Sequence, residues 1–185
     1  MHFTVEAQNR CRPWIPESSV AIDATAGNGF DTLFLAECVG PRGIVYAMDI
    51  QADAIHRTQQ RVDQAGFTPR VVCVQTDHAR LVDHLPQACV GKVSCAMFNL
   101  GYLPHSDKTI VTQAGSTTRA LVAIEPMLAI DSVLSILAYV GHPSGKEESQ
   151  AVEQWIESRQ SNYRIERLVD PSNPTSPILW LLRKR

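Results

Sequence analysis

The sequence predicts an α/β fold, with a mostly parallel sheet of seven strands and helices on both of its faces. Short apolar runs alternate with helix-like segments, and most of the runs are continuously apolar, as in strands that are buried on both sides. The last two runs, residues 163–169 and 178–183, are joined by a loop too short for a crossover helix, so we expect an antiparallel hairpin. A chain of 185 residues with 44% hydrophobic residues suits one domain, residues 1–185.

Breaker residues between the runs set the order of the expected elements. A helix over residues 3–12, in an N-terminal segment of residues 1–19, is ended by Pro13 and Pro16, because proline cannot continue a helix. We then expect strands over residues 20–23, 44–50, 71–76, 93–98, 132–140, 163–169 and 178–183. The helices between them should begin near Asp31, Ala52, Thr112 and Lys146 and end near Val39, Ala65, Ala129 and Gln160, and a short helical stretch that ends at Leu85 should follow Asp77-His78.

Composition narrows the classes of function. The net charge is −2, so a nucleic-acid partner would have to be met by a local basic face. The five cysteines are odd in number and form no C-x-x-C pair, which favours a reducing compartment without a disulfide framework or a metal site. No apolar run approaches the roughly 20 residues that span a membrane, and no signal-peptide pattern opens the chain, so we expect a cytoplasmic protein.

A glycine loop between the first strand and its helix is the first candidate site. Such a turn lets backbone N–H groups approach a ligand closely. The fit to the dinucleotide pattern G-x-G-x-x-G is poor, because Thr32 stands at its sixth position. An acid before G-x-G better suits an S-adenosylmethionine pocket, where a carboxylate can face the sulfonium; an ordinary strand–helix turn is the alternative. The predicted cofactor contacts of this loop are Asp23, Ala24, Thr25, Gly27, Asn28, Gly29, Asp31 and Thr32.

The next two strand ends complete a trough shaped for a nucleoside. Ligands of this architecture bind outside the carboxyl ends of the strands. Asp49 ends the second strand, where a carboxylate can accept both ribose hydroxyls, and Ile50 and Gln51 would flank the adenosine. Asp77 and His78 follow the third strand and suit the adenine edge. A solvated loop acid and a capping or surface histidine are the alternatives for Asp49 and His78.

The fourth strand end predicts the chemistry. Asn99-Leu100-Gly101-Tyr102 has the outline of the N-P-P-Y motif of amino-directed methyltransferases, from which it departs at Leu100 and Gly101. In that motif the Asn carbonyl and a backbone carbonyl accept hydrogen bonds from the target amine, and the aromatic ring packs on the substrate. We therefore predict Asn99 and Tyr102 as catalytic residues that also contact cofactor and substrate respectively. The alternative is a plain strand-to-loop turn with a core tyrosine.

Two further residues are candidates for proton transfer. An alkyl amine has a pKa of about 10 and must lose a proton before it can attack. Asp107 and His142 would overhang the same pocket and are the predicted proton acceptors, with water as an alternative and a structural role open for His142. Lys108 could hold a phosphate or be solvated. No cysteine lies at a strand end, which argues against covalent methylation of a pyrimidine carbon.

Three longer motifs resemble the YtqB/MnmM-type methyltransferases, a family also labelled rRNA methylases. They are Asp23 to Thr32 (DATAGNGFDT), Asn99 to Lys108 (NLGYLPHSDK) and Gly141 to Glu148 (GHPSGKEE). The resemblance implies a Rossmann-like class I fold that uses S-adenosylmethionine. It also implies N-methylation of 5-aminomethyl-2-thiouridine at the tRNA wobble position, giving 5-methylaminomethyl-2-thiouridine. His105-Ser106 and Ser144 depart from the family pattern, and the resemblance carries nothing onto residues 1–19.

RNA binding would require a composite surface. Arg10, Arg12, Lys108, Arg119, Lys146 and residues 183–185 are candidates for a phosphate-binding face, against the reading that they are ordinary solvated charges. The predicted partner is a tRNA anticodon stem-loop, and a homodimer is one way to extend the binding surface. The predicted substrate contacts are Leu100, Gly101, Tyr102, Lys108 and Arg119. The rival functions are methylation of rRNA or of a small-molecule amine, an NAD-dependent oxidoreductase, and a non-catalytic binding module.

Overall fold

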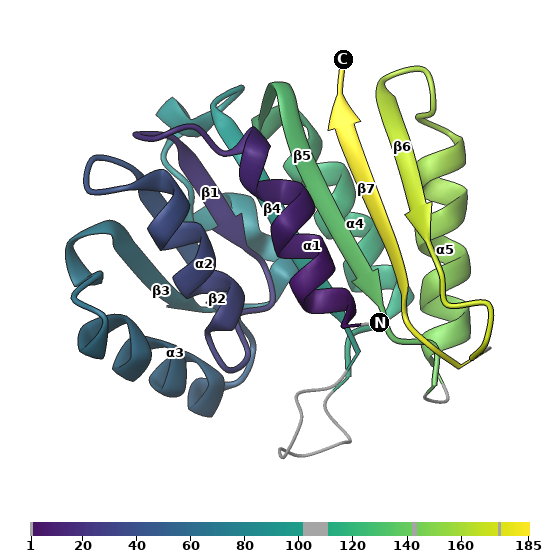
Figure 1. Cartoon of the computed structure of the whole chain (residues 1–185), viewed down its shortest axis with the longest axis horizontal. Helices are drawn as coiled ribbons and strands as arrows, with labels where there is room; N and C mark the ends of the chain where they lie inside the picture. Colours follow the sequence, from purple (N-terminus) through teal and green to yellow (C-terminus); the bar gives the residue numbers. More distant parts are fainter. Residues whose placement is uncertain (1, 102–110, 142–143, 174) are drawn as a thin grey trace.

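A seven-stranded sheet organises the described part of the chain, residues 2–101, 111–141, 144–173 and 175–185 of a computed structural model. The strands are β1 (Val20–Asp23), β2 (Ile44–Asp49), β3 (Val71–Gln75), β4 (Val93–Leu100), β5 (Leu128–Ala138), β6 (Tyr163–Leu168) and β7 (Ile178–Lys184). Their order is β3-β2-β1-β4-β5-β7-β6 (Figure 1). The first five strands run parallel, and β7 lies antiparallel between β5 and β6. The predicted mostly parallel sheet and its C-terminal hairpin are confirmed.

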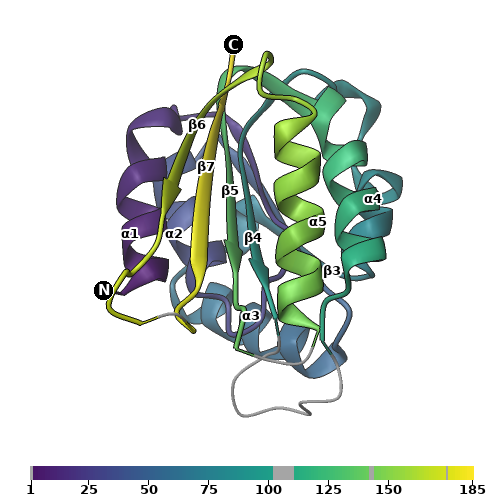
Figure 2. The ribbon, with the colours of Figure 1, turned by 90° about the vertical axis from the view of Figure 1, so that its right-hand side faces the viewer.

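Helices cover both faces of the sheet, as predicted (Figure 2). They are α1 (Phe3–Cys11), α2 (Phe30–Val39), α3 (Ala52–Gln64), α4 (Ala114–Ile124) and α5 (Gly145–Glu157), with short 3-10 turns at Arg12–Trp14, Thr68–Arg70, His78–His84, Gln87–Cys89 and Glu125–Met127. One apolar core lies under α1, α2 and α3, and a second lies under α4, α5 and the turn after β3. Within the described ranges, no helix has the length and apolarity that crossing a membrane would require.

Two of the boundaries that differ from the prediction concern β4 and the segment before β5. β4 runs on through Asn99 and Leu100, which pair with β5, so Asn99 sits on a strand where we expected the start of a loop. The helix expected to reach Ala129 ends at Ile124, and a 3-10 turn containing Pro126 follows. Proline lacks the N–H that a helix interior requires, so the chain turns there and β5 begins at Leu128.

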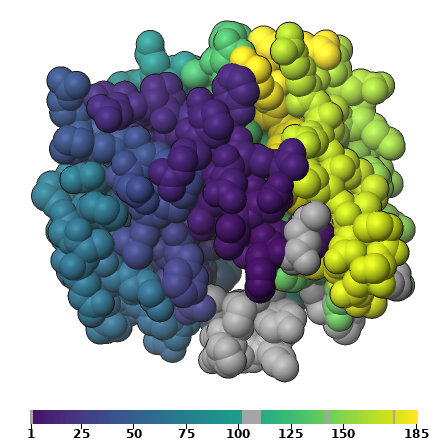
Figure 3. All heavy atoms as spheres, in the orientation of Figure 1, coloured from purple at the N-terminus to yellow at the C-terminus, as the bar shows by residue number. Residues whose placement is uncertain are grey.

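The N-terminal helix belongs to the body of the fold. Phe3, Ala7 and Cys11 recur every four residues and are buried on one face of α1, which packs against β5 and β7. Figure 3 shows this N-terminal segment along the middle of one face, between the early helices and the C-terminal strands. The first turns of α1 lie near the carboxyl ends of the parallel strands (Figure 1).

Candidate active site

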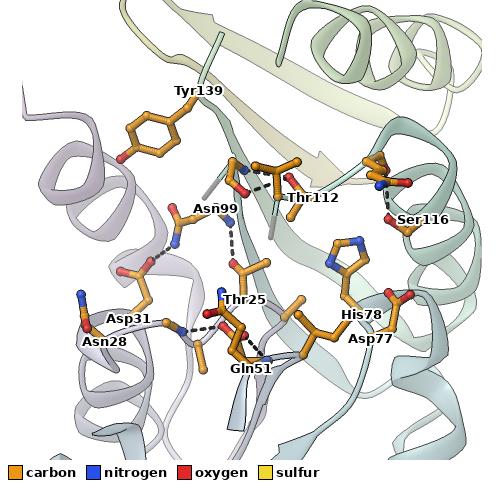
Figure 4. A pocket seen from close by; sticks show the side chains of 18 of the residues that line it. Thr25, Asn28, Asp31, Gln51, Asp77, His78, Asn99, Thr112, Ser116 and Tyr139 are labelled. Carbon is orange, nitrogen blue, oxygen red and sulfur yellow. Dashed lines mark hydrogen bonds between the residues drawn. The ribbon is translucent and has the colours of Figure 1, made fainter. Parts of the chain in front are cut away.

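A cavity of about 640 Å³ opens at the carboxyl ends of the parallel strands. This is within the size range of small-molecule and cofactor sites. Most of the residues predicted to form the site line it, and Figure 4 shows how they converge from β1, β2, β4 and the turn after β3. The lining residues that the sequence predicted are Ala24, Thr25, Gly27, Asn28, Asp31, Asp49, Ile50, Gln51, Asp77, His78, Asn99, Gly101 and Arg119.

The glycine loop is shaped by two residues in the left-handed region of backbone space. Gly27 has a φ of 53° and Gly29 a φ of 80°, conformations that other residues adopt at a cost. A Cβ on Gly29 would lie 3.1 Å from the Cα of Thr58, so this glycine lets α3 pack closely on the start of α2. Gly29 does not line the cavity. Its part in the site is to shape the loop, whereas Gly27 borders the ligand space.

Asp49 is held in a fixed orientation by two backbone donors. The N–H of Gly27 donates to Oδ2 at 2.9 Å, and the N–H of Gln51 donates to Oδ1 at 2.9 Å. Burial raises the pKa of this carboxyl, while the backbone hydrogen bonds oppose the rise. Each carboxylate oxygen keeps a second lone pair for a ligand. The side chain can therefore accept hydrogen bonds from two vicinal hydroxyls without moving.

Asp23 does not face the cavity, contrary to the sequence expectation. The residue is fully buried, its Oδ2 accepts a hydrogen bond from the Thr32 hydroxyl at 2.6 Å, and its Oδ1 accepts one from the Thr25 N–H at 3.3 Å. Burial, followed by the charge of Asp31, raises the pKa of Asp23 to about 7. Thr32 is equally buried and also lies outside the cavity lining. Asp23 at the end of β1 and Thr32 on α2 therefore bind each other beneath the glycine loop and support it.

Asp31 is the acid of this loop that reaches the cavity. Its Oδ1 accepts a hydrogen bond from Gln8 Nε2 at 2.6 Å, and its Oδ2 accepts one from Asn99 Nδ2 at 2.6 Å. Burial raises the pKa of Asp31, and the two amide donors oppose the rise. The carboxylate is thus placed between the N-terminal helix and the end of β4.

Asn99 is fixed at both its backbone and its side chain. Its N–H donates to the Thr25 hydroxyl at 2.7 Å, and its side-chain amide donates to Asp31. In Figure 4 the amide oxygen of Asn99 points away from Asp31, toward the side of the cavity where Tyr139 lies. A rigid hydrogen-bond acceptor therefore stands at the end of β4, beside the glycine loop.

The next two positions explain why the sequence departs from N-P-P-Y. Leu100 is fully buried in the core and does not line the cavity, so the predicted substrate contact is corrected to a packing role. Gly101 has a φ of 150°, which proline cannot adopt. A Cβ there would lie 3.2 Å from the Cβ of Tyr139, so glycine lets the two segments approach. The Gly101 N–H donates to the Thr112 hydroxyl at 2.7 Å.

Asp77 and His78 line the cavity beside the turn after β3. Asp77 caps the turn after β3 by accepting a hydrogen bond from the Ala79 N–H at 2.8 Å. The ring of His78 packs edge-on against Phe98 with 6.1 Å between ring centroids, and Nε2 lies 3.4 Å from the Thr117 hydroxyl. Burial lowers the pKa of His78, which favours a neutral ring at pH 7. The His78 ring and the Asp77 side chain therefore border this part of the cavity, and their contact with an adenine ring stays a prediction.

Comparison with known proteins identifies the family. Residues 45–183 match a family described as "Putative rRNA methylase". The chain belongs to this rRNA methylase family. From Arabidopsis thaliana, "tRNA (mnm(5)s(2)U34)-methyltransferase, chloroplastic" is 36% identical in an alignment of 180 residues that covers 92% of this chain. The chain spans about two thirds (65%) of the length of that relative.

Two solved structures are similar to this chain over nearly its full length. A "putative rRNA-methylase" from Clostridium thermocellum is 29% identical with a TM-score of 0.92, covering 98% of this chain and 97% of that one. A "putative methyltransferase" from Streptococcus mutans, solved in complex with SAH, is 26% identical with a TM-score of 0.85 and the same coverage. The predicted Rossmann-like class I methyltransferase fold and the family resemblance are both confirmed.

In this rRNA methylase chain, some predicted site residues lie outside the described ranges, and some residues that line the cavity were not predicted. Tyr102, Asp107, Lys108 and His142 fall in the undescribed segments, so their roles stay predictions. The lining residues that sequence reasoning missed are Thr4, Ala26, Phe30, Val111, Thr112, Gln113, Gly115, Ser116 and Tyr139. Tyr139 directly follows β5, a signal that could have found it. Thr4 carried no such signal, because only tertiary packing brings α1 to the cavity.

Proposed function

We propose that this chain is an S-adenosylmethionine-dependent N-methyltransferase acting on tRNA. It would methylate the 5-aminomethyl group of 5-aminomethyl-2-thiouridine at the wobble position, giving 5-methylaminomethyl-2-thiouridine. The observation that carries the proposal is the Asn99 amide oxygen, held rigidly at the end of β4 beside the glycine loop. The Arabidopsis relative bears this activity in its name, and the Streptococcus mutans structure is a complex with SAH, which supports the cofactor assignment.

The residues present fit the proposed cofactor. Asp49 offers two fixed acceptor oxygens for ribose hydroxyls, and the backbone of Gly27 and Asn28 borders the space where an amino-acid tail would lie. Ile50 and Gln51 would flank the adenosine, with Asp77 and His78 at the adenine edge. Bound there, S-adenosylmethionine supplies the electrophilic methyl group.

The rest of the chemistry is positioning and proton transfer. The amide oxygen of Asn99 accepts a hydrogen bond from the neutral acceptor amine and aims its lone pair along the line of displacement. Such alignment can lower the activation barrier by several kcal/mol. Tyr139 lines the cavity on the side toward which that oxygen points. Asp107, His142 and water remain the candidates for removing the proton.

RNA is the proposed partner, bound near the cavity mouth. Arg119 is exposed at that mouth, whereas other predicted phosphate contacts have partners within the chain: Arg10 donates to Glu6 and Glu166, Arg12 to Glu37, and Arg183 to Asp131. The C-terminal end of β7 lies at the opposite edge of the sheet from the cavity (Figure 1). We propose that the RNA-binding surface is composite and that a homodimer extends it. A cytoplasmic location is also a proposal, since the Arabidopsis relative is named as chloroplastic.

The acceptor is tested directly with purified protein. We would incubate it with S-adenosylmethionine and tRNA that carries 5-aminomethyl-2-thiouridine, and analyse the nucleosides by mass spectrometry. Conversion to the methylated nucleoside is expected, and unmodified tRNA is the control. Because the family is described by rRNA methylation, rRNA forms the second arm; methylation confined to rRNA would overturn the tRNA assignment. Calorimetric titration with S-adenosylmethionine and NAD separates the methyltransferase from the oxidoreductase reading.

A further inference from the structure

We propose that Gln8 is a positioning residue of the methyl-transfer site: acting through Asp31, it fixes the Asn99 amide so that its oxygen faces the acceptor amine. The inference rests on the proposed function and extends it to the N-terminal helix. Gln8 does not line the cavity, so it acts through its neighbours.

The three residues form one continuous hydrogen-bond chain across three elements. Gln8 on α1 donates to Oδ1 of Asp31 at 2.6 Å, and Asn99 at the end of β4 donates to Oδ2 of the same carboxylate at 2.6 Å. Asp31 lies in the first turn of α2 and is 4% exposed. Each carboxylate oxygen thus has its own amide donor, one from each side.

The chemistry of these groups decides which end of Asn99 faces the cavity. An ionised carboxylate only accepts hydrogen bonds, so the NH₂ end of the Asn99 amide must face Asp31 and the carbonyl end must face away. A carboxylate held by a single donor can rotate about its χ2 torsion, a soft torsion. The Gln8 donor removes this freedom and favours the charged form of the buried Asp31. Loss of Gln8 would therefore loosen the orientation of Asn99.

The packing of α1 explains how Gln8 reaches this position. Phe3, Ala7 and Cys11 bury one face of the helix against β5 and β7. That docking directs Thr4 to the cavity and Gln8 to Asp31, one helical turn apart on the same face. The same stretch of α1 thus contributes a lining residue and a supporting residue.

The first test replaces Gln8 by alanine in the full chain. We expect the single-turnover rate of amine methylation to fall about tenfold or more, because one hydrogen bond to a charged group is lost, while SAH affinity by calorimetry stays within about twofold. Gln59→Ala is the matched control, because Gln59 donates to Asp63 on α3 and does not line the cavity. A Gln8→Ala rate equal to that of the control would overturn the proposal.

The second test uses Gln8→Glu, which keeps the shape but places a second acid beside Asp31. At high pH this side chain repels Asp31, whereas its protonated form can donate the hydrogen bond that Gln8 makes. The ratio of the variant rate to the wild-type rate should therefore rise as pH falls from 9 to 6, and taking the ratio cancels protonation of the acceptor amine. A constant ratio would contradict the positioning role, since a purely structural defect has no reason to recover.

A third readout does not depend on the acceptor. The side-chain amide resonances of Asn99, assigned by their loss in Asn99→Ala, should shift in Gln8→Ala and stay in place in Gln59→Ala. Unmoved resonances would overturn the proposal even if tRNA methylation is demonstrated. Conversely, a wild-type protein that methylates no tRNA amine contradicts the proposed function, while the resonance shift still decides the role of Gln8.

Discussion

At the scale of residues, the two acids at the ends of the glycine loop have different roles, which their positions in the sequence do not reveal. Asp23 and Asp31 are both more than nine-tenths buried, but only Asp31 lines the cavity. Asp23 binds Thr25 and Thr32 and so supports the loop from behind. Asp31 binds side chains from α1 and β4 and so shapes the reactive end. The acid placed second in the sequence is thus the one that can influence a ligand.

The first prediction separates cofactor binding from chemistry. Asp49→Ala should weaken S-adenosylmethionine binding by about tenfold or more, because two fixed acceptor oxygens are lost. Asn99→Ala should leave that affinity within about threefold but lower the rate of methyl transfer by about a hundredfold, because it removes the amine acceptor and the hydrogen bond to Asp31 but leaves the Asp49 oxygens in place. Calorimetry and single-turnover kinetics measure the two quantities. Near-normal turnover in Asn99→Ala would contradict the amine-aiming role.

The second prediction concerns pH and the buried Asp23. Its pKa is raised from 3.8 to about 7 in the folded state, so between these values the folded protein binds more protons than the unfolded one. The free energy of unfolding should therefore fall as pH rises through this window, by up to about 1.4 kcal/mol per pH unit. Asp23→Asn removes this dependence, so its stability relative to wild type should increase with pH. Urea unfolding at pH 5 to 8 checks this; a pH-independent difference would count against it.

At the scale of elements, a buried glutamate ties α5 to α4 beside the cavity. Glu148 is 1% exposed; its Oε2 accepts a hydrogen bond from the Thr112 hydroxyl at 2.6 Å, and its Oε1 accepts one from the Thr117 hydroxyl at 2.5 Å. Thr112 also binds the backbone of Gly101. Glu148 therefore fixes the position of Thr112, and through it the position of Gly101 at the end of β4.

The third prediction tests this tie. Glu148→Ala should lower the free energy of unfolding by about 2–4 kcal/mol, because two hydrogen bonds to a buried carboxyl group are lost and two hydroxyls lose their acceptor. Glu147→Ala, on the exposed side of the same turn, should change it by less than about 0.5 kcal/mol. Chemical denaturation of both variants provides the comparison. Equal stability of the two variants would mean that the tie contributes little.

The elements also show what the sequence could predict and what it could not. Apolar runs and their glycine and proline breakers predicted the central strands, because burial on two faces leaves a local signature, whereas β6 has the sequence YRIERL and is mostly exposed. The extension of β4 through Asn99 had no such signature, since pairing with β5 decides it. The roles of Gln8 and Thr4 depend on the docking of α1 across the sheet, a contact between segments far apart in the chain. Tertiary packing therefore determines the parts of the site that the motifs did not include.

At the scale of the whole molecule, two exposed arginines lie at opposite ends of the parallel strands. The net charge is −2, and several arginines are held by acids within the chain. Arg119 differs in lying exposed at the cavity mouth, where its charge also lowers the pKa of His78. Arg42 is exposed in the turn before β2, at the opposite edge of the sheet. The two arginines therefore form a matched pair for locating the RNA.

The last prediction uses this pair. Each phosphate contact contributes about 0.7 to the slope of log affinity against log salt for single-stranded nucleic acid. Arg119→Ala should therefore weaken tRNA binding severalfold at low salt and reduce the slope by about that amount, whereas Arg42→Ala should leave both unchanged. Binding is measured by fluorescence anisotropy with a labelled anticodon stem-loop between 50 and 200 mM salt. Equal effects of the two substitutions would indicate that only overall charge matters, and an effect of Arg42→Ala alone would place the RNA at the other edge of the sheet.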